Sequence, residues 1–168
     1  ADGKIIGRLP DMKSEETKRA ILSAHEAFPA WAALRAKDRA KVLNKTASLL
    51  EEHSDALAAL MTLEQGKPVK EAKAEIHYAA SYFEWYAAQA QRACGEVTPS
   101  PFKDSRTITI RQPIGVCAII TPWNFPIAMV ARKVAAALAA GCTAVCKPAE
   151  QTPYSALALA YVMEHAGL

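Results

Sequence analysis

Two short apolar runs, "GVCAIIT" at residues 115–121 and "TAVCK" at residues 143–147, flank a single helical pattern. Neither run alternates apolar with polar residues, which is typical of a strand covered on both faces. The pattern between them, "PIAMVARKVAAALAAG", is bracketed by Pro126 and Gly141, and a second helical pattern, "TPYSALALAYVMEHAG", follows. The order strand, helix, strand, helix predicts a βαβα unit of a doubly wound parallel sheet, an α/β fold.

Three longer helical patterns precede this unit. "SEETKRAILSAHEAF" places Ser14 as the expected N-cap residue with acidic residues in the first turn. "KDRAKVLNKTASLLEEHSDALAALMTLEQG" predicts one long helix that stops at Gly66. "PVKEAKAEIHYAASYFEWYAAQAQRACG" predicts a helix that starts near Pro68 and ends at Gly95. Together they predict a helical layer with one buried face.

The pattern changes after Gly95. "EVTPSPFKDS" is rich in turn formers, and "RTITIRQPIG" alternates β-branched with polar residues, which predicts a half-solvated antiparallel strand. The sequence therefore suggests three parts: a helical part at residues 1–95, an antiparallel segment at 96–114 and the βαβα part at 115–168.

Composition excludes several classes of partner. With 51% hydrophobic and 22% charged residues the chain resembles a soluble globular protein, and its net charge of +3 is spread over interspersed basic and acidic residues. We therefore expect no nucleic-acid partner. The apolar stretch "VAAALAAG" is too short to cross a bilayer, so we expect no membrane partner.

The four cysteines predict neither a disulfide framework nor a metal site. Cys142 and Cys146 are four residues apart, but no second pair and no nearby His completes a zinc site. We expect free thiols, in keeping with a reducing compartment.

The ends of the two predicted parallel strands are the places to search for a ligand, because open parallel sheets bind ligands beyond the carboxyl ends of their strands. The first loop, "ITPWNFP", contains no glycine, which argues against a phosphate cradle. At the second strand end, in "CKPAE", Lys147 and Glu150 stand where nucleotide-binding sheets place an acid on a ribose hydroxyl. The alternative is a helix-initiating turn with two solvated charges, and the residues alone slightly favour it.

Asn124 in the first loop also has two interpretations. Its side-chain amide can donate two hydrogen bonds without a change of charge, which suits a developing oxyanion. It can equally cap the turn ahead of Pro126, and spacing alone favours the cap.

The segment "PIGVCAIITPWNFPIAMVARKVAAALAAGCTAVCKPAEQTPYSALALA" resembles the aldehyde dehydrogenase superfamily, whose members carry a Pro-Trp-Asn-Phe-Pro loop and a Lys-Pro-x-Glu or Lys-Pro-x-Ser turn at this separation. "MTLEQGKPVKEAKAEIHYAASYFEWYA" is similar in particular to the succinate-semialdehyde dehydrogenases. The resemblance covers essentially the whole chain, and it implies part of a Rossmann-like cofactor domain.

The resemblance also implies roles for individual residues. Asn124 matches the catalytic asparagine that stabilises the oxyanion of the thiohemiacetal, and Arg132 matches an arginine associated with the carboxylate of succinate semialdehyde. An exposed helix charge remains the alternative for Arg132. Glu150 implies NAD as the cofactor, with NADP as the alternative. The implied cofactor-binding residues are Ile120, Thr121, Pro122, Trp123, Asn124, Lys147, Pro148, Ala149 and Glu150.

Three features of the superfamily are absent. None of the cysteines stands in the Gly-Gln-x-Cys context of the family nucleophile, and the general-base glutamate and the glycine-rich pyrophosphate segment are missing. All three lie downstream in family members, so the resemblance implies a fragment from the N-terminal region that is inactive alone. The parent enzyme would oxidise succinate semialdehyde to succinate with NAD(P) through a cysteine thiohemiacetal and thioester.

Two alternatives stay open. The chain could be a truncated, non-catalytic relative that acts as a nucleotide-binding or assembly module, or its parent could oxidise glutarate semialdehyde or an uncharged aldehyde. "RTITIRQ" resembles part of the family's oligomerisation arm, which implies a homo-oligomeric parent. The cytoplasm is the expected compartment, and the mitochondrial matrix also fits.

Overall fold

The computed structural model describes residues 4–168. Helices and strands follow the chain in the order α1 Ser14–Ala33, α2 Ala36–Glu52, α3 Ser54–Gln65, α4 Val69–Ala90, β1 Glu96–Pro99, β2 Arg106–Thr109, β3 Val116–Ile120, α5 Ala128–Ala139, β4 Thr143–Lys147 and α6 Pro153–His165.

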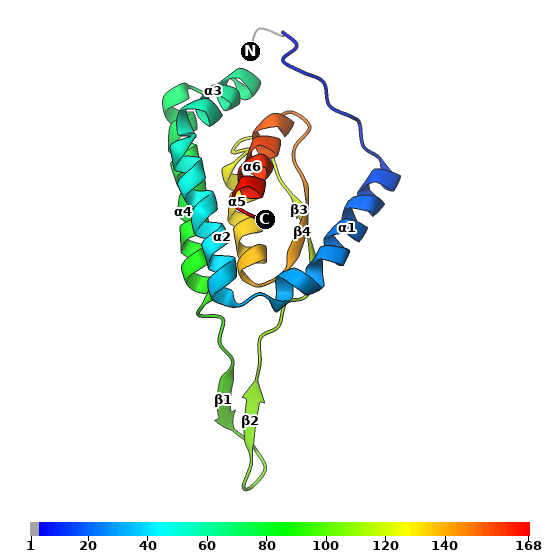
Figure 1. Ribbon diagram of the computed structural model, residues 1–168, viewed down its shortest axis with the longest axis vertical. Coiled ribbons are helices and arrows are strands. Elements are labelled where there is room, and N and C mark those ends of the chain that lie inside the picture. The colour runs from blue at the N-terminus through cyan, green and yellow to red at the C-terminus, as the bar shows by residue number, and fades with distance from the viewer. Residues whose placement is uncertain (1–3) are drawn as a thin grey trace.

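Strands β3 and β4 form the centre of the molecule. They pair in parallel, in a register that runs from Val116 opposite Thr143 to Ile120 opposite Lys147. Figure 1 shows these strands between α1 on one side and α5 with α6 on the other, while α2, α3 and α4, with the turns between them, form an outer helical layer. The predicted βαβα unit and its parallel pairing are therefore confirmed.

One hydrophobic core joins the helical layer to the βαβα unit. Helix α4 packs on both α2 and α5, and the alanine-rich inner face of α5, with Ala131 and Ala135 fully buried, lets α4 approach closely. The largest fully buried apolar side chains are Phe83, Leu43, Leu50, Met61, Ile76, Ile127 and Leu159.

The expected coverage of the strands on both faces is wrong at their carboxyl ends. Ile119 is buried, but Ile120 is 73% exposed, and Cys146 and Lys147 are exposed as well. The flanking helices therefore cover the two-stranded sheet only in part and leave the last residue of β3 and the last two of β4 open to solvent. The same edge carries the candidate site.

Helix α1 begins and ends differently from the prediction. Lys13, not Ser14, is the N-cap residue, because the carboxylate of Glu16 accepts a hydrogen bond from the Lys13 amide at 2.9 Å and so sets the start of the helix. The helix also continues through Pro29 to Ala33. Trp31 holds this last turn in place, since its indole Nε1 donates to the carbonyl oxygen of Leu138 at 3.1 Å.

The predicted long helix up to Gly66 is two helices. The chain leaves helical geometry at His53, which separates α2 from α3. Ser54 and Asp55 then supply the small and acidic residues that favour a new helix start. Gly66 ends α3 as predicted, in the left-handed conformation with φ of 80°. The break brings the end of α3 to the carboxyl edge of the sheet.

Helix α4 ends at Ala90 rather than at the predicted Gly95. The turn-rich start of the predicted antiparallel segment contains β1. This strand pairs with β2 in an antiparallel hairpin, which confirms the direction predicted for "RTITI". Every residue of both strands is exposed, so the expected half-buried face is absent from the described chain. In Figure 1 the hairpin projects away from the body of the molecule.

In residues 4–168 we find no helix that is both long enough and apolar enough to cross a membrane.

Candidate active site

The parallel register brings the two predicted ligand-binding segments together. Ile120 and Lys147 end their strands side by side, and the Thr121 amide donates to the Lys147 carbonyl oxygen at 3.3 Å. The loop of residues 121–127 and the turn of residues 148–152 therefore leave the same edge of the sheet. All nine residues predicted to bind a cofactor lie in these two segments or at the strand ends that lead into them.

The first loop is anchored at its ends and open in its middle. Thr121 and Pro126 are buried, whereas Trp123, Asn124 and Phe125 are exposed. Asn124 lies at the centre of the exposed part. This arrangement presents the Asn124 side chain on a loop whose two ends are held by the core.

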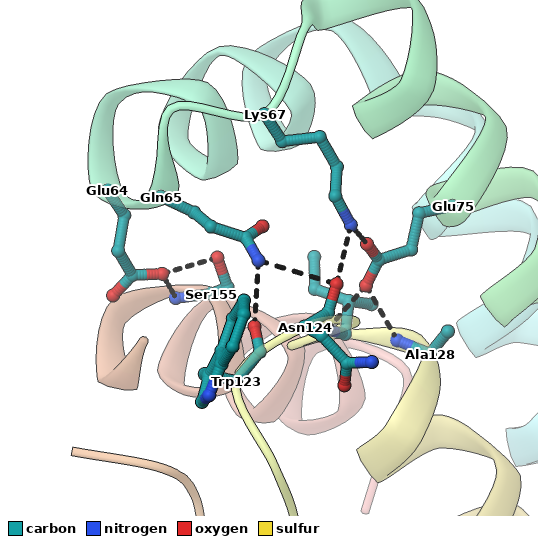
Figure 2. A network of polar contacts seen from close by, with 9 residues as sticks. Glu64, Gln65, Lys67, Glu75, Trp123, Asn124, Ala128 and Ser155 are labelled. Carbon is teal, nitrogen blue, oxygen red and sulfur yellow. Dashed lines mark hydrogen bonds and ion pairs between the residues drawn. The ribbon is translucent and has the colours of Figure 1, made fainter. Parts of the chain in front are cut away.

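Side chains of the helical layer also hold the backbone of this loop, as Figure 2 shows. The Gln65 amide donates to the carbonyl oxygens of Trp123 at 2.9 Å and Asn124 at 3.3 Å. The Lys67 ammonium donates to the Asn124 carbonyl oxygen at 2.9 Å. In Figure 2 the side-chain amide of Asn124 points away from these partners, and it makes no hydrogen bond within residues 4–168. Its two N–H donors are thus available to a ligand.

Glu75 fixes the other end of the loop. Its side chain is fully buried, and one carboxylate oxygen accepts hydrogen bonds from the amides of Ile127 at 3.0 Å and Ala128 at 3.1 Å. The other oxygen forms an ion pair with Lys67, whose ammonium also lies 4.2 Å from the centre of the Phe125 ring. A carboxylate therefore already occupies the start of α5, which supports the prediction that no phosphate binds there.

Glu64 plays the same part at the start of α6. Its carboxylate accepts hydrogen bonds from the amides of Tyr154 at 2.5 Å and Ser155 at 3.0 Å, and from the Ser155 hydroxyl at 2.6 Å. Two glutamates from the helical layer thus cap the two helices that follow the parallel strands.

Lys147 and Glu150 face solvent at the second strand end. Their side chains form an ion pair at 3.3 Å and are 60% and 85% exposed. An exposed pair of this kind contributes about 0 to 1 kcal/mol, so a ligand can open it at little cost. Residues 148–152 form the turn that leads into α6, and the ribose-binding role of the two charged residues stays a prediction.

Arg132 lies on the exposed side of α5. Within residues 4–168 its guanidinium forms no ion pair, and it makes a weak contact with the Met129 sulfur at 3.9 Å. It also lies near Tyr82 of α4. The hydrogen bond to Tyr78 raises the pKa of Tyr82, and the nearby Arg132 charge lowers it by less. The guanidinium is therefore available to an anionic group.

Two of the four cysteines, Cys117 and Cys146, are not activated as nucleophiles. Partial burial is the main cause that raises the pKa of both the Cys117 and Cys146 thiols, and the charge of Lys133 only partly opposes it at Cys146. All four cysteines are free. Within the described residues there is no group of three or more His, Cys, Asp and Glu side chains able to hold a metal ion.

Sequence reasoning missed the side chains that hold the loop, namely Gln65, Lys67 and Glu75, and it also missed Glu64, which caps α6. One signal was present: Glu75 shares the buried face of α4 with Ala72, Ile76 and Ala79, at helical spacing. A charged residue on such a face needs a buried partner. The sequence could therefore have indicated that Glu75 is paired, but not with which groups.

Residues 1–168 match the model of the aldehyde dehydrogenase family. The whole chain is 58% identical to a glutarate-semialdehyde dehydrogenase of Pseudomonas aeruginosa and 56% identical to the succinate-semialdehyde dehydrogenase [NADP(+)] GabD of Escherichia coli strain K12. It covers 35% of each relative, so it spans about a third of their length.

The structure agrees with these matches. A crystal structure described as an E. coli NADP-dependent enzyme superposes on the whole chain with a TM-score of 0.98 at 56% identity, over 35% of that protein. The predicted fold, part of a doubly wound Rossmann-like sheet preceded by a helical layer, is confirmed.

Proposed function

Because the chain belongs to the aldehyde dehydrogenase family, we propose that it forms the N-terminal part of the cofactor-binding domain of an NAD(P)-dependent aldehyde dehydrogenase. The observation that carries this proposal is the Asn124 side chain: its amide is free, while its backbone is held by Gln65 and Lys67. We further propose that residues 1–95 and 115–168 belong to the cofactor-binding domain and that residues 96–114 belong to an oligomerisation arm.

Asn124 would act on the reacting aldehyde. In the full-length enzyme a cysteine outside these 168 residues attacks the aldehyde carbon, and negative charge develops on the oxygen. The Asn124 amide donates a hydrogen bond to that oxygen, and because the loop is already fixed, little reorganisation is needed as the charge forms. The nicotinamide cofactor, when bound, supplies the hydride acceptor.

Lys147 and Glu150 would hold the adenosine ribose of the cofactor. Both side chains are exposed at the carboxyl end of β4, where they offer an ammonium donor and a carboxylate acceptor that suit ribose hydroxyls. The Glu150 charge disfavours a 2′-phosphate, which supports NAD as the preferred cofactor. The name of the E. coli relative specifies NADP, so NADP is the alternative.

The proposed substrate is succinate semialdehyde, with glutarate semialdehyde as the alternative. The names of the two relatives support an aldehyde that carries a carboxylate. The unpaired guanidinium of Arg132 suits such a group because it can donate two parallel hydrogen bonds to it.

The full-length enzyme is proposed to be a homo-oligomer. The projecting hairpin exposes Val97, Ile108 and Ile110, an apolar surface that a second subunit can cover.

The four free cysteines support a reducing compartment, the cytoplasm or the mitochondrial matrix. The alternative, a truncated relative that acts as an assembly module, is supported by the same hairpin. It would give no function to the free side-chain amide of Asn124.

The test is Asn124→Ala in the full-length enzyme, assayed by NADH or NADPH formation from succinate semialdehyde. We expect kcat to fall by roughly 10²- to 10³-fold, as for loss of one oxyanion donor. Asn44→Ala, at the only other asparagine of the chain and exposed on α2, is the matched control and should keep its rate. An unchanged kcat in Asn124→Ala would reject the proposed role.

The NAD preference is tested by assaying the wild-type enzyme with each cofactor in turn. Equal or faster turnover with NADP would contradict this preference.

A further inference from the structure

Two charged residues, Lys67 and Glu75, lie where they can fix the backbone of the Asn124 loop. Lys67 contacts the carbonyl oxygen of Asn124, and Glu75 contacts the amides of Ile127 and Ala128. The ion pair between Lys67 and Glu75 joins these two contacts. We propose that the Lys67–Glu75 pair is a positioning element that sets the direction of the Asn124 amide. This inference rests on the proposed role of Asn124.

The contacts form a closed ring. It runs from the Asn124 carbonyl oxygen to the Lys67 ammonium, on to the Glu75 carboxylate, and through the Ile127 amide back along residues 125 and 126 to Asn124. The ring therefore constrains the backbone on the carboxyl side of Asn124, so that mainly side-chain rotation is left to aim the amide. Figure 2 shows the ring on one side of the loop and the Asn124 amide on the other.

Both charged side chains of this ring are buried, so they need the loop backbone as a polar partner. The Glu75 side chain is 0% exposed and that of Lys67 is 10% exposed, so both charges depend on each other and on the loop backbone. Lys67 also lies over the Phe125 ring, next to Asn124. A pair that served only to join α4 to its neighbours would not need a backbone carbonyl of the exposed loop as a third partner.

Glu64 provides a matched comparison within the same molecule. It is a carboxylate from the same helical layer that caps α6 through two amides and a hydroxyl, and none of these hydrogen bonds reaches the Asn124 loop. Loss of Glu64 removes a helix cap alone. Loss of Lys67 removes the ion pair and the contact with the Asn124 carbonyl oxygen. Loss of Glu75 removes the ion pair and the contacts with the Ile127 and Ala128 amides at the end of the loop.

The experiment is a double-mutant cycle in the full-length enzyme between Lys67→Met and Asn124→Ala, with kcat and KM measured for each variant. We expect Lys67→Met to lower kcat by roughly 10- to 100-fold, the scale of a small displacement of a catalytic group, while KM for the cofactor stays within about twofold. In the Asn124→Ala background the same change should lower kcat by less than about twofold, because no oxyanion donor remains to be misplaced. Lys67→Arg, which keeps the charge, should recover part of the rate.

Two further variants guard against a purely structural explanation. If Lys67→Met does not fold, the double variant Lys67→Met with Glu75→Gln carries the same test, because it leaves no unpaired buried charge. Glu64→Gln should lower thermal stability but keep kcat. The inference is overturned if Glu64→Gln loses as much kcat as Lys67→Met, or if the losses from Lys67→Met and Asn124→Ala simply multiply. If Asn124→Ala alone leaves kcat unchanged, the proposed function fails instead.

Discussion

Glu75 shows at the scale of one residue how a charge on an apolar helix face can be accommodated. Its carboxylate is fully removed from water, yet it has two amide donors and an ammonium partner. Such a pair adds little net stability over apolar residues, but removing one partner typically costs about 3 to 5 kcal/mol because the other charge stays buried. The pair is therefore better explained by what it holds, the loop of Asn124, than by stability.

Arg132 gives the prediction at this scale. Arg132→Ala in the full-length enzyme should lower kcat/KM for succinate semialdehyde by roughly 10- to 100-fold, as expected for loss of a charge-assisted hydrogen bond. An uncharged aldehyde of similar length should lose little, because it has no carboxylate to bind. Steady-state kinetics with both substrates measure the difference. Arg92→Ala, at an exposed arginine just after α4, is the control. Equal losses of kcat/KM for both aldehydes would show that Arg132 does not recognise the substrate carboxylate.

At the scale of elements, helix starts decide where the functional side chains lie. The break at His53 creates α3, whose last turn delivers Glu64 and Gln65 to the carboxyl edge of β3 and β4. A single straight helix over residues 36–65 would not turn at His53 and would carry Glu64 and Gln65 away from this edge. The local sequence signal for the break, Ser54 followed by Asp55, is weak compared with the continuous apolar pattern around it.

The start of α1 gives a prediction of pH dependence. The hydrogen bond from the Lys13 amide is the main cause that lowers the pKa of Glu16 below its usual value. A lowered pKa in the folded state means that the stabilisation is present above the ordinary pKa of a glutamate and is lost as pH falls through the lowered value. Glu16→Gln should therefore lower the urea midpoint at pH 7, and the difference from wild type should shrink as pH falls below about 4.5.

Urea unfolding of the two proteins between pH 7 and pH 3 measures this effect. Glu26→Gln, on the same helix but away from its start, is the control and should not show the same trend. A midpoint difference that is the same at pH 7 and pH 3 would show that the Glu16 charge has no part in starting α1.

At the scale of the whole molecule, the hairpin of β1 and β2 stands apart from the single core. An isolated two-stranded hairpin is marginally stable in water, and this one buries none of its residues within the described chain. Val97 and Ile108 lie opposite each other on one face, and Thr98 and Thr107 on the other. The apolar face is the surface that a partner subunit would cover.

Ile108→Lys therefore gives the prediction at this scale. In the full-length enzyme we expect this change to shift the oligomer toward smaller species, because it places a charge in the apolar surface that a second subunit would cover. Thr107→Lys, on the opposite face of the same strand, is the matched control and should leave the assembly intact. Size-exclusion chromatography with light scattering reports the mass of each. If neither variant changes the mass, the hairpin is not part of the interface.

The sequence alone determined the elements whose signals are local. Hydrophobic periodicity predicted the βαβα order, Gly66 predicted the end of α3, and the loop around Asn124 stood out by its composition. These features depend on the spacing of apolar residues and on residues with special backbone preferences, both of which can be read along the chain.

Only the tertiary structure decided how the loop of Asn124 is held. Lys67 and Glu75 are 57 and 49 positions before Asn124 in the chain, and their contacts exist because α4 packs against α5. Strand β1 was also settled by its pairing with β2, a contact that the turn-rich sequence of residues 96–105 did not indicate. Contacts between distant segments carry no periodic signal in a single sequence, so the partner of a buried charge appears only when the chain is folded.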